Sequence, residues 1–120
     1  MRILIFTQYF WPENFRINDL VQGLVERGHK ITIITGKPNY PSGKIDVEYK
    51  KNPKKFSEYF SANVIRVPVF LRGDGGLAKL FLNYMSYVFC ASLAAWKLRK
   101  DKFDVIFVYE PSPITVCLPA

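Results

Sequence analysis

The first 36 residues alternate between apolar runs and polar loops in the order strand, loop, helix, strand. The segment Arg2–Thr7 is short and apolar on both faces, which is typical of a strand in the middle of a parallel sheet. Apolar residues at helical spacing follow from Ile17 to Val25, and Gly28 suits the position after a helix end, where φ is positive. The β-branched run Lys30–Thr35 predicts a second strand. Together these elements predict a βαβ unit.

Two further strands and a long helix are expected later in the chain. Asn63–Phe70 reads as a strand that is an edge or ends at Pro68, because proline cannot donate to a sheet ladder. Leu77–Lys100 reads as a helix and Phe103–Tyr109 as a fourth strand. The predicted fold class is therefore α/β, a Rossmann-like parallel sheet with helices on both faces. The usual strand order 3-2-1-4 leaves the apolar fourth strand at an edge, so we expect residues 1–120 to be the front part of a longer protein.

The long helix has an unusual distribution of polar residues. Its polar positions fall on one narrow stripe, formed by Lys79, Asn83, Ser86, Cys90 and Lys97. A helix that is apolar around most of its circumference must be buried in protein or in lipid. Three interpretations stay open: a membrane span, which Lys79 and Asn83 shorten below the usual length; a core crossover helix; or a helix that packs on the sheet and leans on the membrane. In the last case Tyr84, Tyr87 and Trp96 suit the membrane interface.

Composition narrows the choice of partner. The net charge of +7 favours an acidic partner such as nucleic acid, an anionic membrane or a phosphorylated substrate. Nucleic acid is disfavoured because the chain has neither an Arg-rich helix nor zinc-ligand spacing. A lysine-rich tract is either a solvated surface or a contact for phosphate or anionic lipid; it comprises Lys50, Lys51, Lys54 and Lys55. We therefore expect an anionic membrane surface as a partner, and no nucleic acid.

Neither a metal site nor a secretion signal is expected. Cys90 and Cys117 form no CxxC or metal-ligand pattern, and both phosphate-binding fingerprints, GxGxxG and GxxxxGK[ST], are absent. Only four apolar residues run together after Arg2, which is too few for a signal peptide. We expect a cytoplasmic protein, peripheral on the inner face of the plasma membrane, that carries no metal or cofactor.

Several motifs resemble the N-terminal domain of GT-B glycosyltransferases of the large family 4 (group 1). They are Arg2–Ile5, Glu26–Gly36, Phe103–Ile106 and Tyr109–Pro113. More narrowly, Tyr9–Glu13 with Gly36–Gly43 looks like the branch that includes bacterial N-acetyl-L-fucosamine transferases of O-antigen and exopolysaccharide assembly. The resemblance covers nearly the whole chain.

The resemblance implies an enzyme of two Rossmann-like domains that face each other across a cleft. Residues 1–120 would be part of the acceptor-side domain, and the donor-binding C-terminal domain would be absent. The full enzyme would transfer a sugar, such as N-acetyl-L-fucosamine from a UDP donor, to a lipid-linked saccharide, whereas the fragment alone would be inactive. The alternative is a non-catalytic Rossmann-type module that binds a nucleotide or a protein partner at the membrane surface.

Candidate substrate-binding residues lie in the loops after the strands, because ligands of parallel sheets bind at the carboxyl ends of the strands. Hydrogen bonds to a sugar are expected from Gln8, Asn14 and Asn39, and stacking from Trp11 and Tyr40, unless these rings form small satellite cores. Asn14, as the helix N-cap, and Arg16 are available to phosphate at the helix start. Glu13 and Glu110 either face each other for acid–base work or simply order a helix start and a loop. No catalytic residue is assigned.

Overall fold

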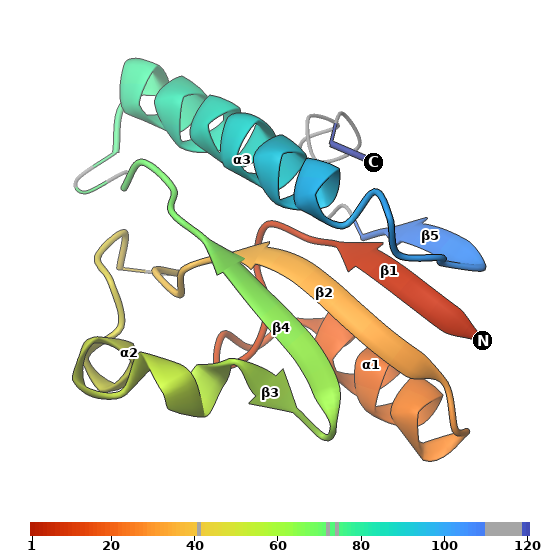
Figure 1. Ribbon diagram of the computed structural model, residues 1–120. Helices are drawn as coiled ribbons and strands as arrows, with labels where there is room; N and C mark the ends of the chain where they lie inside the picture. The colour runs from red at the N-terminus through yellow and green to blue at the C-terminus, as the bar shows by residue number, and fades with distance from the viewer. Residues whose placement is uncertain (41, 72, 74, 110–118) are drawn as a thin grey trace.

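The computed structural model describes residues 1–40, 42–71, 73, 75–109 and 119–120. Its centre is a sheet of four parallel strands in the order β4 (Ala62–Val67), β2 (Lys30–Gly36), β1 (Arg2–Phe6) and β5 (Val105–Val108) (Figure 1). This order is the predicted 3-2-1-4. A short strand, β3 (Glu58–Tyr59), pairs antiparallel with β4 on its outer side. The α/β fold class predicted from the sequence is confirmed.

The two long helices, α1 (Arg16–Glu26) and α3 (Leu77–Lys97), cover opposite faces of the sheet (Figure 1). Alternate side chains of a strand point to opposite faces, so β1 contributes to two cores. Ile3 and Ile5 belong to the core on the α1 side, whereas Leu4 and Phe6 belong, with Tyr87, to the core on the α3 side. The carboxyl ends of all four parallel strands therefore meet at one edge of the sheet, whose inner strands are buried whereas the side chains of the edge strand β5 are largely exposed.

The start of α1 differs from the prediction. Its N-cap residue is Phe15, with an extended backbone and no capping side chain, so the assignment of Asn14 as N-cap was wrong. Asn18, in the first turn of the helix, orders the loop instead. Its side chain accepts a hydrogen bond from the Trp11 backbone N–H (3.0 Å) and donates one to the Glu13 carbonyl (2.7 Å). The end of α1 is as predicted, because Gly28 follows it with φ of 85°.

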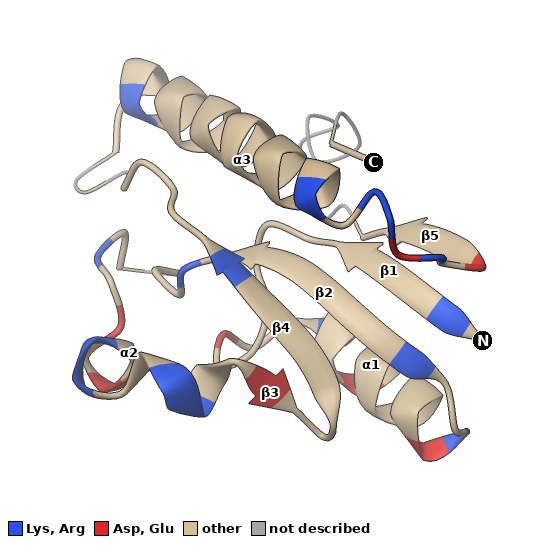
Figure 2. Cartoon of the chain, viewed as in Figure 1, with Lys and Arg blue, Asp and Glu red and all other residues tan. Residues whose placement is uncertain are grey.

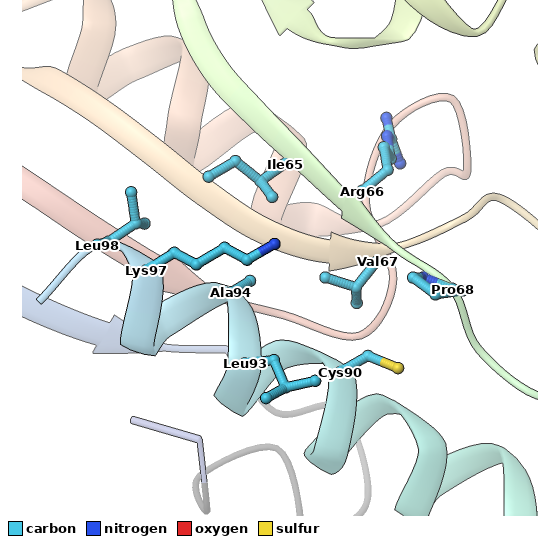
Figure 3. Close-up of a pocket in the computed structure, with 9 residues that line it drawn as sticks. All are labelled: Ile65, Arg66, Val67, Pro68, Cys90, Leu93, Ala94, Lys97 and Leu98. Carbon is cyan, nitrogen blue, oxygen red and sulfur yellow. The ribbon is translucent and has the colours of Figure 1, made fainter.

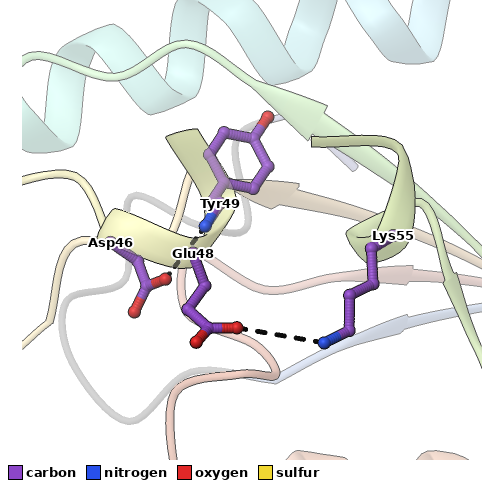
Figure 4. A network of polar contacts seen from close by, with 4 residues as sticks. All are labelled: Asp46, Glu48, Tyr49 and Lys55. Carbon is purple, nitrogen blue, oxygen red and sulfur yellow. Dashed lines mark hydrogen bonds and ion pairs between the residues drawn. The ribbon is translucent and has the colours of Figure 1, made fainter. Parts of the chain in front are cut away.

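The segment after β2 contains more structure than its sequence suggests. A short helix, α2 (Val47–Lys51), and a 3₁₀ turn, η1 (Pro53–Phe56), precede β3. The Asp46 side chain caps α2 by accepting from the Tyr49 N–H (3.0 Å), and Lys55 pairs with Glu48 at 3.9 Å (Figure 4). The four lysines of this tract are exposed, as a solvated surface would be.

The third parallel strand confirms one of the two predicted outcomes for Pro68. β4 ends at Val67, directly before the proline, and it is not an edge strand because β3 pairs with its outer side. The physical reason is that the missing N–H of proline lies just outside the ladder, where no partner strand needs it.

Within the described part of the chain, α3 is the one helix long and apolar enough to cross a membrane. Its contacts nevertheless make it the crossover helix between β4 and β5. Tyr87 is fully buried, and its hydroxyl donates to the Ile34 carbonyl of β2 at 3.0 Å. Ala91, one turn further on, is also fully buried against the sheet. One side of α3 thus belongs to the core of the domain.

Candidate functional site at the carboxyl edge of the sheet

Glu13 holds together the loops that leave β1 and β2. Its carboxylate is 6% exposed and accepts hydrogen bonds from the backbone N–H groups of Asn39 (3.2 Å) and Tyr40 (2.5 Å). A longer contact of 3.4 Å joins it to the N–H of Phe10. Of the two interpretations of Glu13, loop ordering is therefore what the structure supports.

The same burial changes the acidity of Glu13. Desolvation raises its pKa from 4.5 to about 7, against the opposing effects of the three backbone N–H groups and of the positive charge on Arg66. A carboxyl group at this edge of the sheet therefore titrates near neutral pH.

Arg66, on β4, fixes the other side of these loops through backbone carbonyls. Its guanidinium donates to the carbonyls of Trp11, Gly36 (3.4 Å) and Phe56 (3.2 Å). Burial lowers its pKa to about 10, whereas Glu13 and Tyr49 raise it, so the group stays charged at neutral pH. Sequence analysis missed this residue, although one signal was present: Arg66 follows Ala62 and Val64 on the strand face that is otherwise apolar.

The two candidate stacking residues have different surroundings. Trp11 packs against the rings of Phe56 (5.0 Å) and Tyr59 (5.3 Å) at the margin of the core, which is the satellite-core alternative. Tyr40 is 47% exposed, and its ring lies against those of Tyr9 (5.5 Å) and Phe15 (5.1 Å). Only Tyr40 combines a supported ring with an open side.

A small polar cavity lies beside Glu13 and Tyr40. Its volume is about 70 Å³, and Asn39, Ser42, Lys44 and Asp46 are among its lining residues. This is room for about two water molecules or for one polar substituent of a larger ligand. Asn39 is itself buried, and its side-chain amide donates to the Lys37 carbonyl, so it shapes the loop as well as the cavity.

Gln8 does not join this group of residues. It is 3% exposed and donates through Nε2 to Oδ1 of Asn83 on α3 at 2.6 Å, while Asn83 donates to the Phe70 carbonyl at 2.7 Å. The Oε1 atom of Gln8 is buried without a hydrogen-bond partner among the described residues. α3 therefore holds the Gln8 amide away from Asn39, and a hydrogen bond from Gln8 to a sugar stays a prediction.

The remaining candidates are placed only in part. Asn14 and Arg16 are exposed at the start of α1, and neither side chain forms a hydrogen bond within the described ranges. Their contact with phosphate stays a prediction. Glu110 lies outside the described residues, so its pairing with Glu13 is not addressed by the structure.

A second, apolar groove lies between β4 and α3, away from the loops that Glu13 orders. It has a volume of about 410 Å³, and its walls include Ile65, Val67, Cys90 and Leu93. Figure 3 shows the Lys97 side chain lying along this groove. The groove offers apolar surface and one amine.

No three His, Cys, Asp or Glu side chains lie close enough to hold a metal ion in the part of the chain that the structure describes. Comparison with known proteins adds no assignment, since no family model, no curated protein and no solved structure matches the chain.

Proposed function

We propose that this chain forms the acceptor-side part of a GT-B glycosyltransferase that transfers a sugar, such as N-acetyl-L-fucosamine from UDP, to a lipid-linked saccharide. The observation that carries the proposal is the exposed face of Tyr40 beside the polar cavity at the carboxyl edge. Parallel α/β sheets bind their ligands at this edge. The motifs that resemble the family, Tyr9–Glu13 and Gly36–Gly43, are the segments that build the edge.

The chemistry of this edge suits a saccharide better than a free phosphate. A supported aromatic ring packs against the apolar face of a sugar ring, and neighbouring amide and hydroxyl groups form hydrogen bonds with its hydroxyls. Tyr40, Asn39 and Ser42 supply these groups within one loop. The cavity of about 70 Å³ has room for one ring substituent, while the ring itself lies outside on Tyr40.

Glu13 has a positioning role in this proposal. Both of its oxygens already accept backbone hydrogen bonds, so the carboxylate orders the loop that presents Tyr40. Nucleotide-sugar binding and the transfer step belong to a donor domain outside residues 1–120.

The test compares acceptor binding with sugar transfer. We expect the 120-residue chain to bind a polyprenyl-diphosphate-linked saccharide, measured by saturation-transfer NMR, without transferring sugar to it. A chain extended past Ala120 should turn over. Tyr40→Ala should weaken acceptor binding roughly fivefold to tenfold, as expected for loss of one aromatic contact.

The matched control is Phe60→Ala. Phe60 is an aromatic residue of similar exposure, 56%, and lies in the turn before β4, at the amino end of that strand. Removal of its ring should leave acceptor binding unchanged. Transfer by the 120-residue chain alone, or equal effects of the two variants, would contradict the proposal. Binding of UDP by this chain without any acceptor binding would favour the non-catalytic nucleotide-binding module instead.

A further inference from the structure

A row of exposed apolar side chains runs along the outward side of α3. Phe81, Phe89 and Trp96 are 63%, 67% and 62% exposed, and Met85 and Leu93 lie between them on the same side. We call these five residues the outer stripe. Their spacing of four, four, four and three residues keeps them in one row on the helix surface. A contiguous apolar patch of this kind marks a surface that contacts a partner or a membrane.

The polar side of the same helix points inward. Asn83 is fully buried in its contacts with Gln8 and Phe70, and the Ser86 hydroxyl accepts from the Phe70 N–H at 2.7 Å. Cys90 lines the groove towards β4. The usual arrangement of a surface helix, apolar inside and polar outside, is therefore partly reversed in α3.

These inward contacts exclude a membrane span for α3 in this fold. A spanning helix would have to break the buried hydrogen bonds of Tyr87 with Ile34 and of Asn83 with Gln8. The polar groups of these residues would then lack hydrogen-bond partners. The helix instead lies flat on the domain, with its apolar row turned outward.

Charge distinguishes the kind of surface that this row fits. The helix has no acidic residue, and basic residues lie at both of its ends (Figure 2). Lys79 lies in the first turn, while Lys97, Arg99 and Lys100 follow at the other end. The Arg99 guanidinium lies 3.8 Å from the centre of the Trp96 ring, an arrangement that brings a cation and an interfacial aromatic residue together.

We propose that α3 docks the domain on an anionic lipid bilayer, lying in the interface with the outer stripe among the acyl chains and the flanking cations among the headgroups. Interfacial helices combine these two features, an apolar row and a basic border. A second copy of the chain is a poorer occupant, because either orientation of two paired α3 helices brings their basic ends together.

The docked orientation has a geometric consequence. α3 runs opposite to the parallel strands, and Asn83 lies level with Gln8, just beyond the end of β1. The first turn of α3 therefore projects past the carboxyl edge of the sheet, where Leu77 is 86% exposed (Figure 1). The bilayer would then lie on the α3 side of the sheet, with this first turn of the helix extending beyond the carboxyl edge. The inference does not rest on sugar transfer, because vesicle binding is measured without any sugar.

The experiment is co-sedimentation of the 120-residue chain with vesicles of phosphatidylcholine alone or mixed with phosphatidylglycerol. We expect binding to the mixed vesicles that weakens as salt rises, and quenching of tryptophan fluorescence by brominated acyl chains that Trp96→Phe removes. Phe89→Glu should weaken binding roughly tenfold or more, since one buried aromatic side chain is lost. Its control, Leu20→Glu, changes an exposed apolar residue of α1 on the opposite face and should bind as the parent does.

A second pair of variants tests the charges. Changing Lys97, Arg99 and Lys100 together to Gln should weaken binding roughly 100-fold, at about fivefold for each cation near an anionic surface. The matched triple change of Lys50, Lys51 and Lys54, on α2 and η1, should have little effect. Equal losses from the two triple variants, equal binding to neutral vesicles, or no binding at all would overturn the proposal. Self-association of the chain that Phe89→Glu abolishes, without vesicle binding, would overturn it in favour of a second copy.

Discussion

The outward side of α1 carries Arg16, Asp19 and Glu26, whereas the outward side of α3 carries Phe81, Phe89 and Trp96. Both helices pack apolar side chains against the same sheet, from opposite faces. Inward packing therefore does not distinguish them, and it accounts for the fold. The outward residues are what differ, since they are charged on α1 and apolar on α3.

The largest effect expected from this comparison separates the two sides of α3. Tyr87→Ala should lower the free energy of unfolding by about 3–5 kcal/mol, because it empties a fully buried aromatic site and removes a hydrogen bond to β2. Phe89→Ala, two residues away on the outer stripe, should stay within about 0.5 kcal/mol of the parent in the absence of lipid. Urea unfolding followed by circular dichroism measures both. A large loss from Phe89→Ala would mean that the outer stripe already packs against this protein.

The second prediction concerns the α1 side of the sheet, where the loops contain the buried carboxyl group of Glu13. Titration of this group should make the unfolding free energy depend on pH. Its pKa in the folded protein is about 7, above the ordinary value of 4.5, so the folded form binds this proton more tightly. Protonation of Glu13 therefore stabilises the folded protein. This stabilisation is fully present below about pH 4.5 and is lost as the pH rises through 7, by about 3 kcal/mol at most.

Glu13→Gln is the control for that titration, because it keeps the shape of the side chain and removes the charge. The difference in unfolding free energy between parent and variant should change between pH 4.5 and 7 and level off outside this window. A difference that is constant across the window would show that Glu13 does not titrate there.

The smallest effect concerns the neutral polar pair beneath α3. Asn83→Leu alone should destabilise the domain, because it leaves the buried Gln8 amide without its partner. The double variant with Gln8→Leu should cost about 1–2 kcal/mol less than the sum of the two single variants. Additive losses in this double-mutant cycle would indicate that the two amides do not interact.

The parallel order of the sheet was predictable because its signals are local. Apolar β-branched runs mark β1 and β2, Gly28 marks the end of α1, and Pro68 marks the end of β4. Each depends on the chemistry of neighbouring residues, so a single sequence contains it. The short elements α2 and β3 were missed, since two to five residues give no period to recognise.

The candidate site was predicted less well because its contacts join residues far apart in the chain. The loops that bear Glu13 and Tyr40 were placed at one edge, and the structure joins them there. Arg66 was missed, since its three carbonyl partners belong to separate segments and carbonyls have no sequence signature. The contact of Gln8 with α3 was not predicted, because no local pattern reveals that Asn83, 75 residues later, accepts a hydrogen bond from its amide.

The three carbonyls that Arg66 contacts have a consequence for protein engineering. Every amino acid supplies a backbone carbonyl. The hydrogen bonds of the guanidinium therefore do not depend on which side chain stands at position 11, 36 or 56. Segments between these anchor points can therefore diverge in evolution, or be exchanged by grafting, while their ends stay in register with β4. Specificity at this edge can change without a new scaffold.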